Sequence, residues 1–334
     1  MGSPPYAEQE AAPVHYDLDA AELAAYLPAR DEPDDFDLFW KRTLQEHNEP
    51  PSIQLSRVDT GLSTVDTYDV TFAGYGGQPV KAWLVLPTAT AGPLPCVVQY
   101  VGYGDGRGLA IDHLIWASAG YAHLVMDSRG QGGETGDGPL PPAAGTDADG
   151  PPVVRGLRDP AEYYYRRVYV DAVRVVEAAR TRPELDAGRI ILAGASQGGG
   201  IALAAAALLA VPASAVLCDL PFLCHWSRAV RVSDRGPYAE VARYCASHRL
   251  PVATVFDTLR YFDGMAFAAR CQTPALFSVA LMDRVCPPST VYAAYNHYGG
   301  DKRMVVWEFN DHEGGGSHQT SHQLAFLRQL LPSI

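Results

Sequence analysis

The sequence Gly-Ala-Ser-Gln-Gly at residues 194–198 places one serine at the apex of a glycine-flanked turn. The apolar run Ile190 to Ala193 precedes it and a long Ala- and Leu-rich segment follows, so the pattern predicts a strand, a tight turn and a helix. Such a GxSxG turn exposes the serine hydroxyl to a histidine base and turns the next backbone N–H towards a developing oxyanion. We therefore expect Ser196 to be a nucleophile and Gln197 to supply one oxyanion N–H.

A serine nucleophile needs a histidine base and a carboxylate that orients the base. Among ten histidines, His312 alone combines a position just after a predicted strand with flanking glycines. Asp283 follows the strand predicted at Pro274 to Ala280, and the chain order Ser, Asp, His is one that serine hydrolases with parallel sheets use. Asp219 and Asp257 compete for the acid position. We favour Asp283 because its strand directly precedes the elements that deliver His312, and we expect Asp219 to be structural.

The second oxyanion donor should come from the loop after an early strand. Gly102-Tyr103-Gly104 occupies that place, and we select the backbone N–H of Tyr103, with a non-catalytic glycine-rich turn as the alternative. Arg129 begins another glycine-rich turn after a predicted strand. Its several donors could hold the loops of the site together, although an ordinary loop arginine fits the spacing nearly as well.

These residues require strands that end together at one edge of a sheet. A Gly76-Gly77 turn between two strand patterns indicates an antiparallel opening, and from Cys96 onward strands alternate with helices, which is typical of parallel strands with helices on both faces. The predicted strands are Thr67 to Phe72, Val80 to Leu86, Cys96 to Val101, Ala122 to Met126, Ile190 to Ala193, Ala215 to Leu220, Ala275 to Ala280 and Met304 to Phe309. The predicted helices of this part are Leu109 to Ala117, Ala161 to Arg180, Gly200 to Leu209, Ser289 to Tyr298 and Thr320 to Leu331.

We expect one α/β domain over residues 1–334, with a mostly parallel central sheet. Helical patterns at Ala20 to Tyr26 and Phe36 to Leu44 predict an N-terminal helical extension over residues 1–60. Residues 222–267 break the alternation after the sixth predicted strand with several short helical patterns, which predicts a helical insertion that covers the site. Residues 130–153 are dense in Gly, Pro, Ala and Asp and predict a long surface loop.

Charge and composition exclude several classes of partner. A formal net charge of -12, without a Lys/Arg block, argues against a nucleic-acid or phosphate-binding surface. The six cysteines lack the spacing of zinc sites, and we read Cys218, Cys224 and His225 as buried residues rather than metal ligands. Met1 to Glu10 lacks the features of a secretory signal, and Ile201 to Leu217 is too short and interrupted to span a bilayer. We expect a cytoplasmic protein with reduced thiols and small partners, without nucleic acid or membrane.

A nucleotide-binding protein is the rival from another class. Gly194, Ser196 and Gly199 approximate a GxGxxG pattern, and Asp219 lies near the position of a ribose-binding acid. A serine side chain at the second position would obstruct the approach of a pyrophosphate, and this alternative leaves Asp283 and His312 without a role. A non-catalytic binding module on the same fold is a further alternative.

Three motifs in order resemble the signatures of the carbohydrate esterase family that includes acetyl xylan esterase and cephalosporin C deacetylase. They are Arg129-Gly130-Gln131, the serine turn at residues 194–198, and His312-Glu313. Other segments also look like family sequence, from about Leu27 to the last helix, among them Tyr163-Tyr164-Tyr165-Arg166-Arg167 and Cys286-Pro287-Pro288-Ser289-Thr290.

This resemblance implies an α/β-hydrolase fold with Ser196 as nucleophile, His312 as general base and acid, and Asp283 as its orienter. Tyr103 and Gln197 would supply the oxyanion N–H groups, and no cofactor or metal would be needed. It implies an intracellular esterase that removes acetyl groups from xylo-oligosaccharides and cephalosporin C, assembled as a hexamer, a dimer of trimers. A hydrolase of longer acyl esters or thioesters is the nearest alternative. The loop over residues 134–152 looks unlike the family, which leaves its role open.

Overall fold

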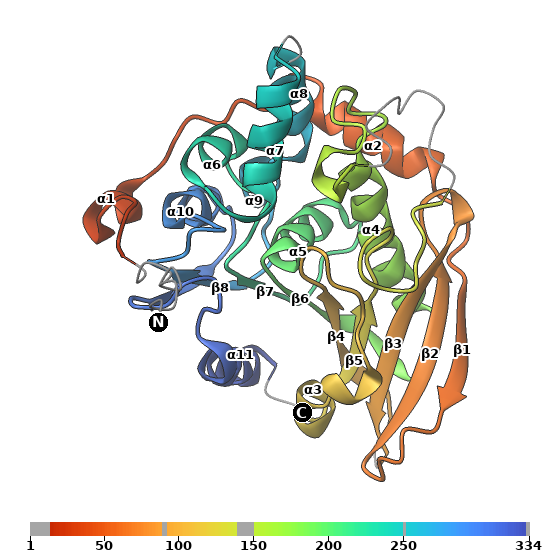
Figure 1. Ribbon diagram of the computed structural model, residues 1–334. Helices are drawn as coiled ribbons and strands as arrows, with labels where there is room; N and C mark the ends of the chain where they lie inside the picture. Colours follow the sequence, from red (N-terminus) through yellow and green to blue (C-terminus); the bar gives the residue numbers. More distant parts are fainter. Residues whose placement is uncertain (1–13, 89–91, 139–149, 250–251, 332–334) are drawn as a thin grey trace, which may run out of the picture.

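The computed structural model describes residues 14–88, 92–138, 150–249 and 252–331. These form a nine-stranded sheet in the order β1-β2-β3-β5-β4-β6-β7-β8-β9 (Figure 1). The pairs β1–β2, β2–β3 and β3–β5 are antiparallel, and every pair from β5 to β9 is parallel. The expected fold class, a mostly parallel sheet with an antiparallel opening, is therefore confirmed.

The strands differ from the prediction mainly at one edge of the sheet. Their bounds are β1 Ile53–Val58, β2 Val65–Ala73, β3 Pro79–Pro87, β4 Leu94–Tyr100, β5 Ala122–Met126, β6 Leu185–Ala195, β7 Ala215–Asp219, β8 Ala275–Ala280 and β9 Lys302–Trp307. β1 lies inside the segment that we expected to be a helical extension. It pairs on one side only and no side chain in it is fully buried, so its sequence carries little hydrophobic signal. With β1 counted, the helical insertion follows the seventh strand rather than the sixth.

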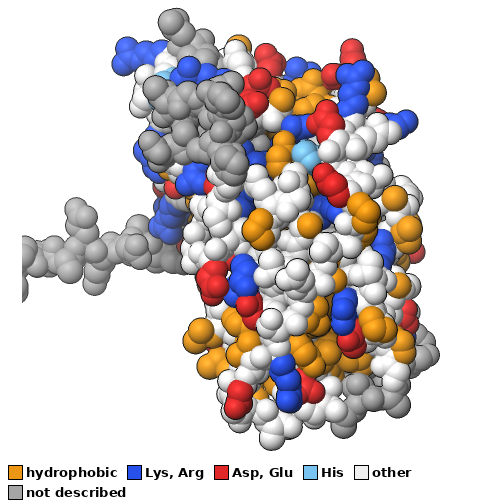
Figure 2. Space-filling view, turned by 90° about the vertical axis from the view of Figure 1, so that its right-hand side faces the viewer, with side chains coloured by type: hydrophobic (Ala, Val, Ile, Leu, Met, Phe, Trp, Pro, Cys, Tyr) orange, Lys and Arg blue, Asp and Glu red, His pale blue; other side chains and the backbone are white. Residues whose placement is uncertain are grey.

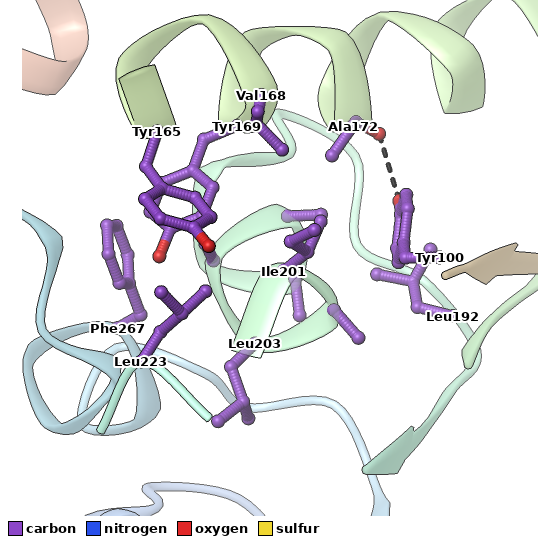
Figure 3. Close-up of a cluster of buried hydrophobic side chains, with 14 of the residues drawn as sticks. Tyr100, Tyr165, Val168, Tyr169, Ala172, Leu192, Ile201, Leu203, Leu223 and Phe267 are labelled. Atoms are coloured by element: carbon purple, nitrogen blue, oxygen red, sulfur yellow. Dashed lines mark hydrogen bonds between the residues drawn. The ribbon is translucent and has the colours of Figure 1, made fainter. Parts of the chain in front are cut away.

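Helices cover both faces of the sheet. On one face lie α4 (Tyr164–Arg180), α5 (Gln197–Leu208) and α10 (Pro288–His297), and on the other lie α3 (Ile115–Ser118) and α11 (Gly316–Leu330) (Figure 1). Figure 3 shows the core between α4, α5 and the sheet, where the Tyr100 hydroxyl donates to the Ala172 carbonyl at 2.9 Å. α5 is buried almost all round, which explains its continuous apolar sequence.

The helix expected over Leu109 to Ala117 is wrong. The chain forms a short 3₁₀ turn, η2 (Ala110–Asp112), and then α3. The Asp112 carboxylate accepts a hydrogen bond from the Leu109 N–H, and the backbone at His113 leaves the helical region, so the two pieces do not join. Gly108 precedes the break with a positive φ of 57°, a conformation that favours glycine.

The N-terminal helices α1 (Ala20–Ala25) and α2 (Phe36–Glu46) confirm two expected helical patterns. The insertion consists of α6 (Trp226–Val232), α7 (Gly236–Ser247), α8 (Val252–Leu259), the 3₁₀ turn η5 (Arg260–Phe262) and α9 (Gly264–Ala268). Of the surface loop expected at residues 130–153, residues 139–149 lie outside the described residues.

The surface near β1 mixes charges of both signs. Figure 2 views the molecule from this side and shows acidic and basic side chains interspersed among apolar ones. Arg57 of β1 forms an ion pair with Asp66 of β2 at this edge. Charged side chains on an edge strand disfavour pairing with another sheet. In the described ranges, no helix combines the length and the apolar character needed to cross a membrane.

Candidate active site

The predicted turn at Ser196 joins β6 to α5. Ser196 has φ 54° and ψ -119°, a positive φ that a non-glycine residue rarely adopts. The surrounding structure holds this backbone in place, because the Ser196 N–H donates to the Asp219 carbonyl at 2.9 Å and its carbonyl accepts from Phe222 at 3.0 Å. A Cβ on Gly194 would lie 2.2 Å from the Gly198 backbone, so the turn requires glycine there.

Ser196, His312 and Asp283 form a continuous hydrogen-bonded series. His312 Nε2 lies 3.0 Å from Ser196 Oγ, and His312 Nδ1 lies 2.8 Å from Asp283 Oδ2. The carboxylate accepts the Nδ1–H, so Nε2 is left to accept the Ser196 proton. The structure thus brings together the three residues that we chose from 334 positions, although their catalytic role stays a prediction.

The surroundings of the imidazole suit a general base. Burial alone would lower the pKa of His312, but the hydrogen bond and the charge of Asp283 outweigh it and hold the pKa above its ordinary value of 6.5. Asp283 itself is fully buried, and its second oxygen accepts the backbone N–H groups of Val285 at 2.8 Å and Cys286 at 2.9 Å. These bonds fix which oxygen faces the histidine.

Of the two predicted oxyanion donors, one directly follows the serine and the other lines the same cavity. Gln197 is the first residue of α5, where the helix N-terminus leaves backbone N–H groups without partners. Tyr103 lines the same cavity as Ser196 and follows β4. Within the part of the chain that the structure describes, neither backbone N–H has a hydrogen-bond acceptor. Both are therefore free to bind an oxyanion, and this role stays a prediction.

The side chain of Gln197 has a task that the sequence did not reveal. It is fully buried, and its amide N–H groups donate to the Gly102 carbonyl at 3.0 Å and the Val101 carbonyl at 3.3 Å. Its oxygen accepts from Tyr165 at 2.8 Å and from Gln131 at 2.9 Å. Gln197 therefore holds the loop that presents Tyr103. Position in the GxSxG motif pointed only to the backbone of this residue.

The Arg129 turn does hold loops of the site together, as one of our two interpretations proposed. The buried Arg129 guanidinium binds Asp171 of α4 through Nε at 2.5 Å and through a second nitrogen at 2.7 Å. In the same turn, Gln131 accepts the Gly104 N–H at 2.6 Å and donates to Tyr164 at 2.7 Å. The turn thus joins the Tyr103 loop to α4.

The N-terminal segment supplies contacts that sequence reasoning missed. The Tyr16 hydroxyl donates to the backbone carbonyl of Asp283 at 2.6 Å. The carboxylate of Asp17 binds Arg228 at 2.7 Å and the Ser289 N–H at 2.8 Å. All three contacts span more than 200 residues, and no local pattern around Tyr16 or Asp17 signals them.

Asp219 and Asp257, the two alternatives for the triad acid, have hydrogen-bond or ion-pair partners outside the triad. The Asp219 carboxylate binds Ser278 at 2.9 Å, Gln319 at 2.7 Å and Gln323 at 2.6 Å, and burial raises its pKa to about 6. These bonds engage both oxygens and give Asp219 a structural role, as expected. Asp257 lies exposed on α8, and its carboxylate is 3.4 Å from the guanidinium of Arg260.

Cys218, Cys224 and His225 are buried, as expected. All six cysteines are free, and the Cys218 and Cys224 thiols are buried against backbone carbonyls. His318 and His322 are exposed on α11. One contact was not foreseen, because the sulfur of the buried Cys286 lies 4.0 Å from Ser196 Oγ.

A cavity of about 710 Å³ opens onto Ser196 and His312. Other polar side chains in its lining are those of Gln99, Tyr103, Asp105 and His113, and glycines from three loops form much of the rest. Gly236 and Pro237, which begin α7, contribute one wall. The insertion thus borders the site, and the Tyr103 hydroxyl donates to Glu240 of α7 at 2.7 Å.

One family model and two solved structures that this chain resembles are those of acetyl xylan esterases. The family model described as acetyl xylan esterase matches residues 14–330. The structure is similar to an acetyl xylan esterase from Paenibacillus sp. R4, with a TM-score of 0.86 and 37% identity over 95% of this chain and 100% of that one. It is also similar to acetyl xylan esterase 1 from Thermoanaerobacterium sp. JW/SL YS485, with a TM-score of 0.85 and 31% identity, again over 95% of this chain and 100% of that one.

A third relative is longer than this chain. The acetyl esterase Axe7A of Xylanibacter ruminicola is 27% identical over 294 residues, which cover 85% of this chain. The match spans 64% of the length of that esterase.

Proposed function

The chain belongs to the acetyl xylan esterase family, and from that premise we propose that it is a serine esterase that removes acetyl groups from acetylated xylo-oligosaccharides. The observation that carries the proposal is the series Ser196, His312 and Asp283, with contacts of 3.0 and 2.8 Å beside an open cavity. The resemblance described above extends the proposal to small acetyl esters of the cephalosporin C type.

The chemistry proceeds in two acyl transfers. Ser196 Oγ attacks the acetyl carbonyl carbon while its proton passes to His312 Nε2, and the oxyanion accepts the N–H groups of Tyr103 and Gln197. The intermediate then collapses, the bond to the alcohol oxygen breaks, and His312 gives its proton to the leaving alcohol. Water, deprotonated by His312, attacks the acetyl-serine, and acetate leaves as Ser196 regains its proton. Asp283 stabilises the imidazolium that forms in each half of the cycle.

Acetate release tests this function. The native protein should release acetate from p-nitrophenyl acetate and from acetylated xylo-oligosaccharides, and Ser196→Ala should lose activity on both by at least about 10³-fold. A fluorophosphonate should label the native protein at Ser196, which a non-catalytic binding module would not show. An acyl series from acetyl to octanoyl separates this function from that of a long-chain esterase or thioesterase. Equal rates for the native protein and Ser196→Ala would refute the proposal.

The family resemblance also implies an oligomeric state and a cellular location, which we propose for this chain. We propose a hexamer, built as a dimer of trimers; three exposed apolar side chains within seven residues, Leu109, Ile111 and Ile115, support an interface near η2 and α3. We also propose a cytoplasmic location, which the six free thiols support. Light scattering of the purified protein tests the first proposal, and fractionation of the source cells tests the second.

A further inference from the structure

Asp105 is the only acidic side chain among the described residues that line the catalytic cavity, and those residues include no lysine or arginine. Asp105 stands two positions after Tyr103, on the loop that presents the predicted oxyanion donor. Its Oδ2 lies 2.7 Å from the position that a Cβ on Gly102 would take, so the carboxylate lies against the backbone just before Tyr103. A negative charge this close to an oxyanion site has no evident use in the chemical step itself.

The Asp105 carboxylate is exposed, and no donor among the described residues forms a hydrogen bond or ion pair with it. Arg107, the nearest cation in the sequence, is engaged elsewhere. Its guanidinium binds Asp69 at 2.6 Å and the Ala82 carbonyl at 2.6 Å, and it is 3% exposed. Asp105 therefore faces the cavity with its full acceptor capacity and its charge.

The backbone around Asp105 is fixed before any substrate binds. The Asp105 N–H donates to the Gly102 carbonyl at 3.3 Å, the Gly104 N–H donates to Gln131, and the Arg107 N–H donates to Asp127. A Cβ on Gly106 would lie 2.3 Å from Gly133 Cα, so this loop packs directly against the Arg129 turn. A pre-positioned group binds a ligand with a smaller loss of conformational entropy.

We propose that Asp105 binds free hydroxyl groups of the alcohol half of the substrate, which makes neutral polyol esters the preferred class and disfavours alcohol halves that carry a negative charge. The inference rests on the proposed esterase function and adds to it a residue that selects among the alcohol halves of acetyl esters. An acetyl group has no O–H or N–H, so only the alcohol half can donate to the carboxylate. Two neighbouring sugar hydroxyls match its two oxygens, whereas a carboxylate-bearing alcohol half meets a like charge without a compensating cation.

Relative rates on two acetyl esters test this subsite. Methyl β-xylopyranoside acetylated at one position keeps two free hydroxyls, whereas the alcohol half of p-nitrophenyl acetate has no hydrogen-bond donor. In Asp105→Ala, the ratio of kcat/KM for the sugar ester to kcat/KM for p-nitrophenyl acetate should fall by ~10-fold or more, the scale of a lost charge-assisted hydrogen bond. In Asp105→Asn, this ratio should fall less. The kcat/KM for anionic cephalosporin C should rise relative to the kcat/KM for the sugar ester.

Asp301→Ala is the matched control, because Asp301 is an exposed aspartate just before β9, at the opposite end of the strands from the site. Its ratio should stay at the native value. A native-like ratio in Asp105→Ala, or an equal fall in Asp301→Ala, would overturn the subsite. Failure of the native protein to hydrolyse p-nitrophenyl acetate would instead refute the esterase function, so the two failures are distinct.

Discussion

Replacing Asp283 by asparagine should abolish most activity, because it places the proton of the neutral His312 ring on Nε2 instead of Nδ1. Oδ1 of Asp283 accepts two backbone N–H groups, from Val285 at 2.8 Å and Cys286 at 2.9 Å. An asparagine must keep its oxygen there, because its NH₂ group would otherwise face two donors. The NH₂ group then faces His312 Nδ1, which forces the proton onto Nε2. His312 in that tautomer cannot accept the proton of Ser196.

The expected loss in kcat for Asp283→Asn is about 10⁴-fold, equivalent to ~5.4 kcal/mol of transition-state stabilisation, with little change in KM. Acetate release from p-nitrophenyl acetate between pH 5 and 9 measures it. In the native enzyme, activity should rise with pH through the pKa of His312, which lies above 6.5. The variant loses the charge that raises this pKa, so its residual activity should begin to rise at lower pH.

The raised pKa of His312 also predicts how the His312–Asp283 pair affects the free energy of unfolding at different pH values. Folding raises the pKa of His312, so the pair contributes stability that is fully present below pH 6.5 and is lost as the pH rises through the folded-state value. The difference in unfolding free energy between the native protein and Asp283→Asn should therefore be larger at pH 5.5 than at pH 9.

The kcat of Asp283→Asn tests the predicted change of His312 tautomer. If this variant folds but loses less than tenfold in kcat, that prediction is refuted.

Three other substitutions test the supports of the site. Gln197→Ala removes the hydrogen bond to the Gly102 carbonyl and should lower kcat by ~10²-fold, because the Tyr103 N–H is displaced. An unchanged kcat would show that the Tyr103 loop keeps its position without this bond. Asp171→Ala leaves the buried Arg129 charge unpaired and should lower the unfolding free energy in urea by ~3–5 kcal/mol, and a loss under 1 kcal/mol would contradict this. Tyr16→Phe removes the donor to the Asp283 carbonyl and should lower the unfolding free energy by ~1–3 kcal/mol, whereas native-like stability would mean that solvent replaces the hydroxyl.

The sequence predicted the parts of this site whose signals are local. Ser196 lies between an apolar strand and an apolar helix, and the glycines around it follow from close backbone contacts within the same turn. Asp283 and His312 each follow a strand of the parallel sheet directly. Such positions can be assigned because the topology brings the carboxyl ends of parallel strands to one edge.

The errors and omissions arose where contacts distant in the sequence, or a sheet edge, decide the structure. β1 is an edge strand with weak alternation, so its sequence resembles a loop. The segment of η2 and α3 has helical periodicity, but the Asp112 cap and the backbone at His113 divide it. The side chain of Gln197 gained its role from partners on three other segments, which no spacing within the motif encodes.

The supports also explain why so many polar groups are buried around this site. A transition state gains most from donors that are already oriented, because their reorganisation costs nothing during the reaction. Here the loop of Tyr103 is held by Gln197 from α5 and by Gln131 from the Arg129 turn, while Arg129 is held by Asp171 from α4. Each support is itself buried or bonded on a second side. The expected consequence is that substitutions in these supports reduce kcat more than they raise KM, since they displace donors to the oxyanion and leave the cavity walls in place.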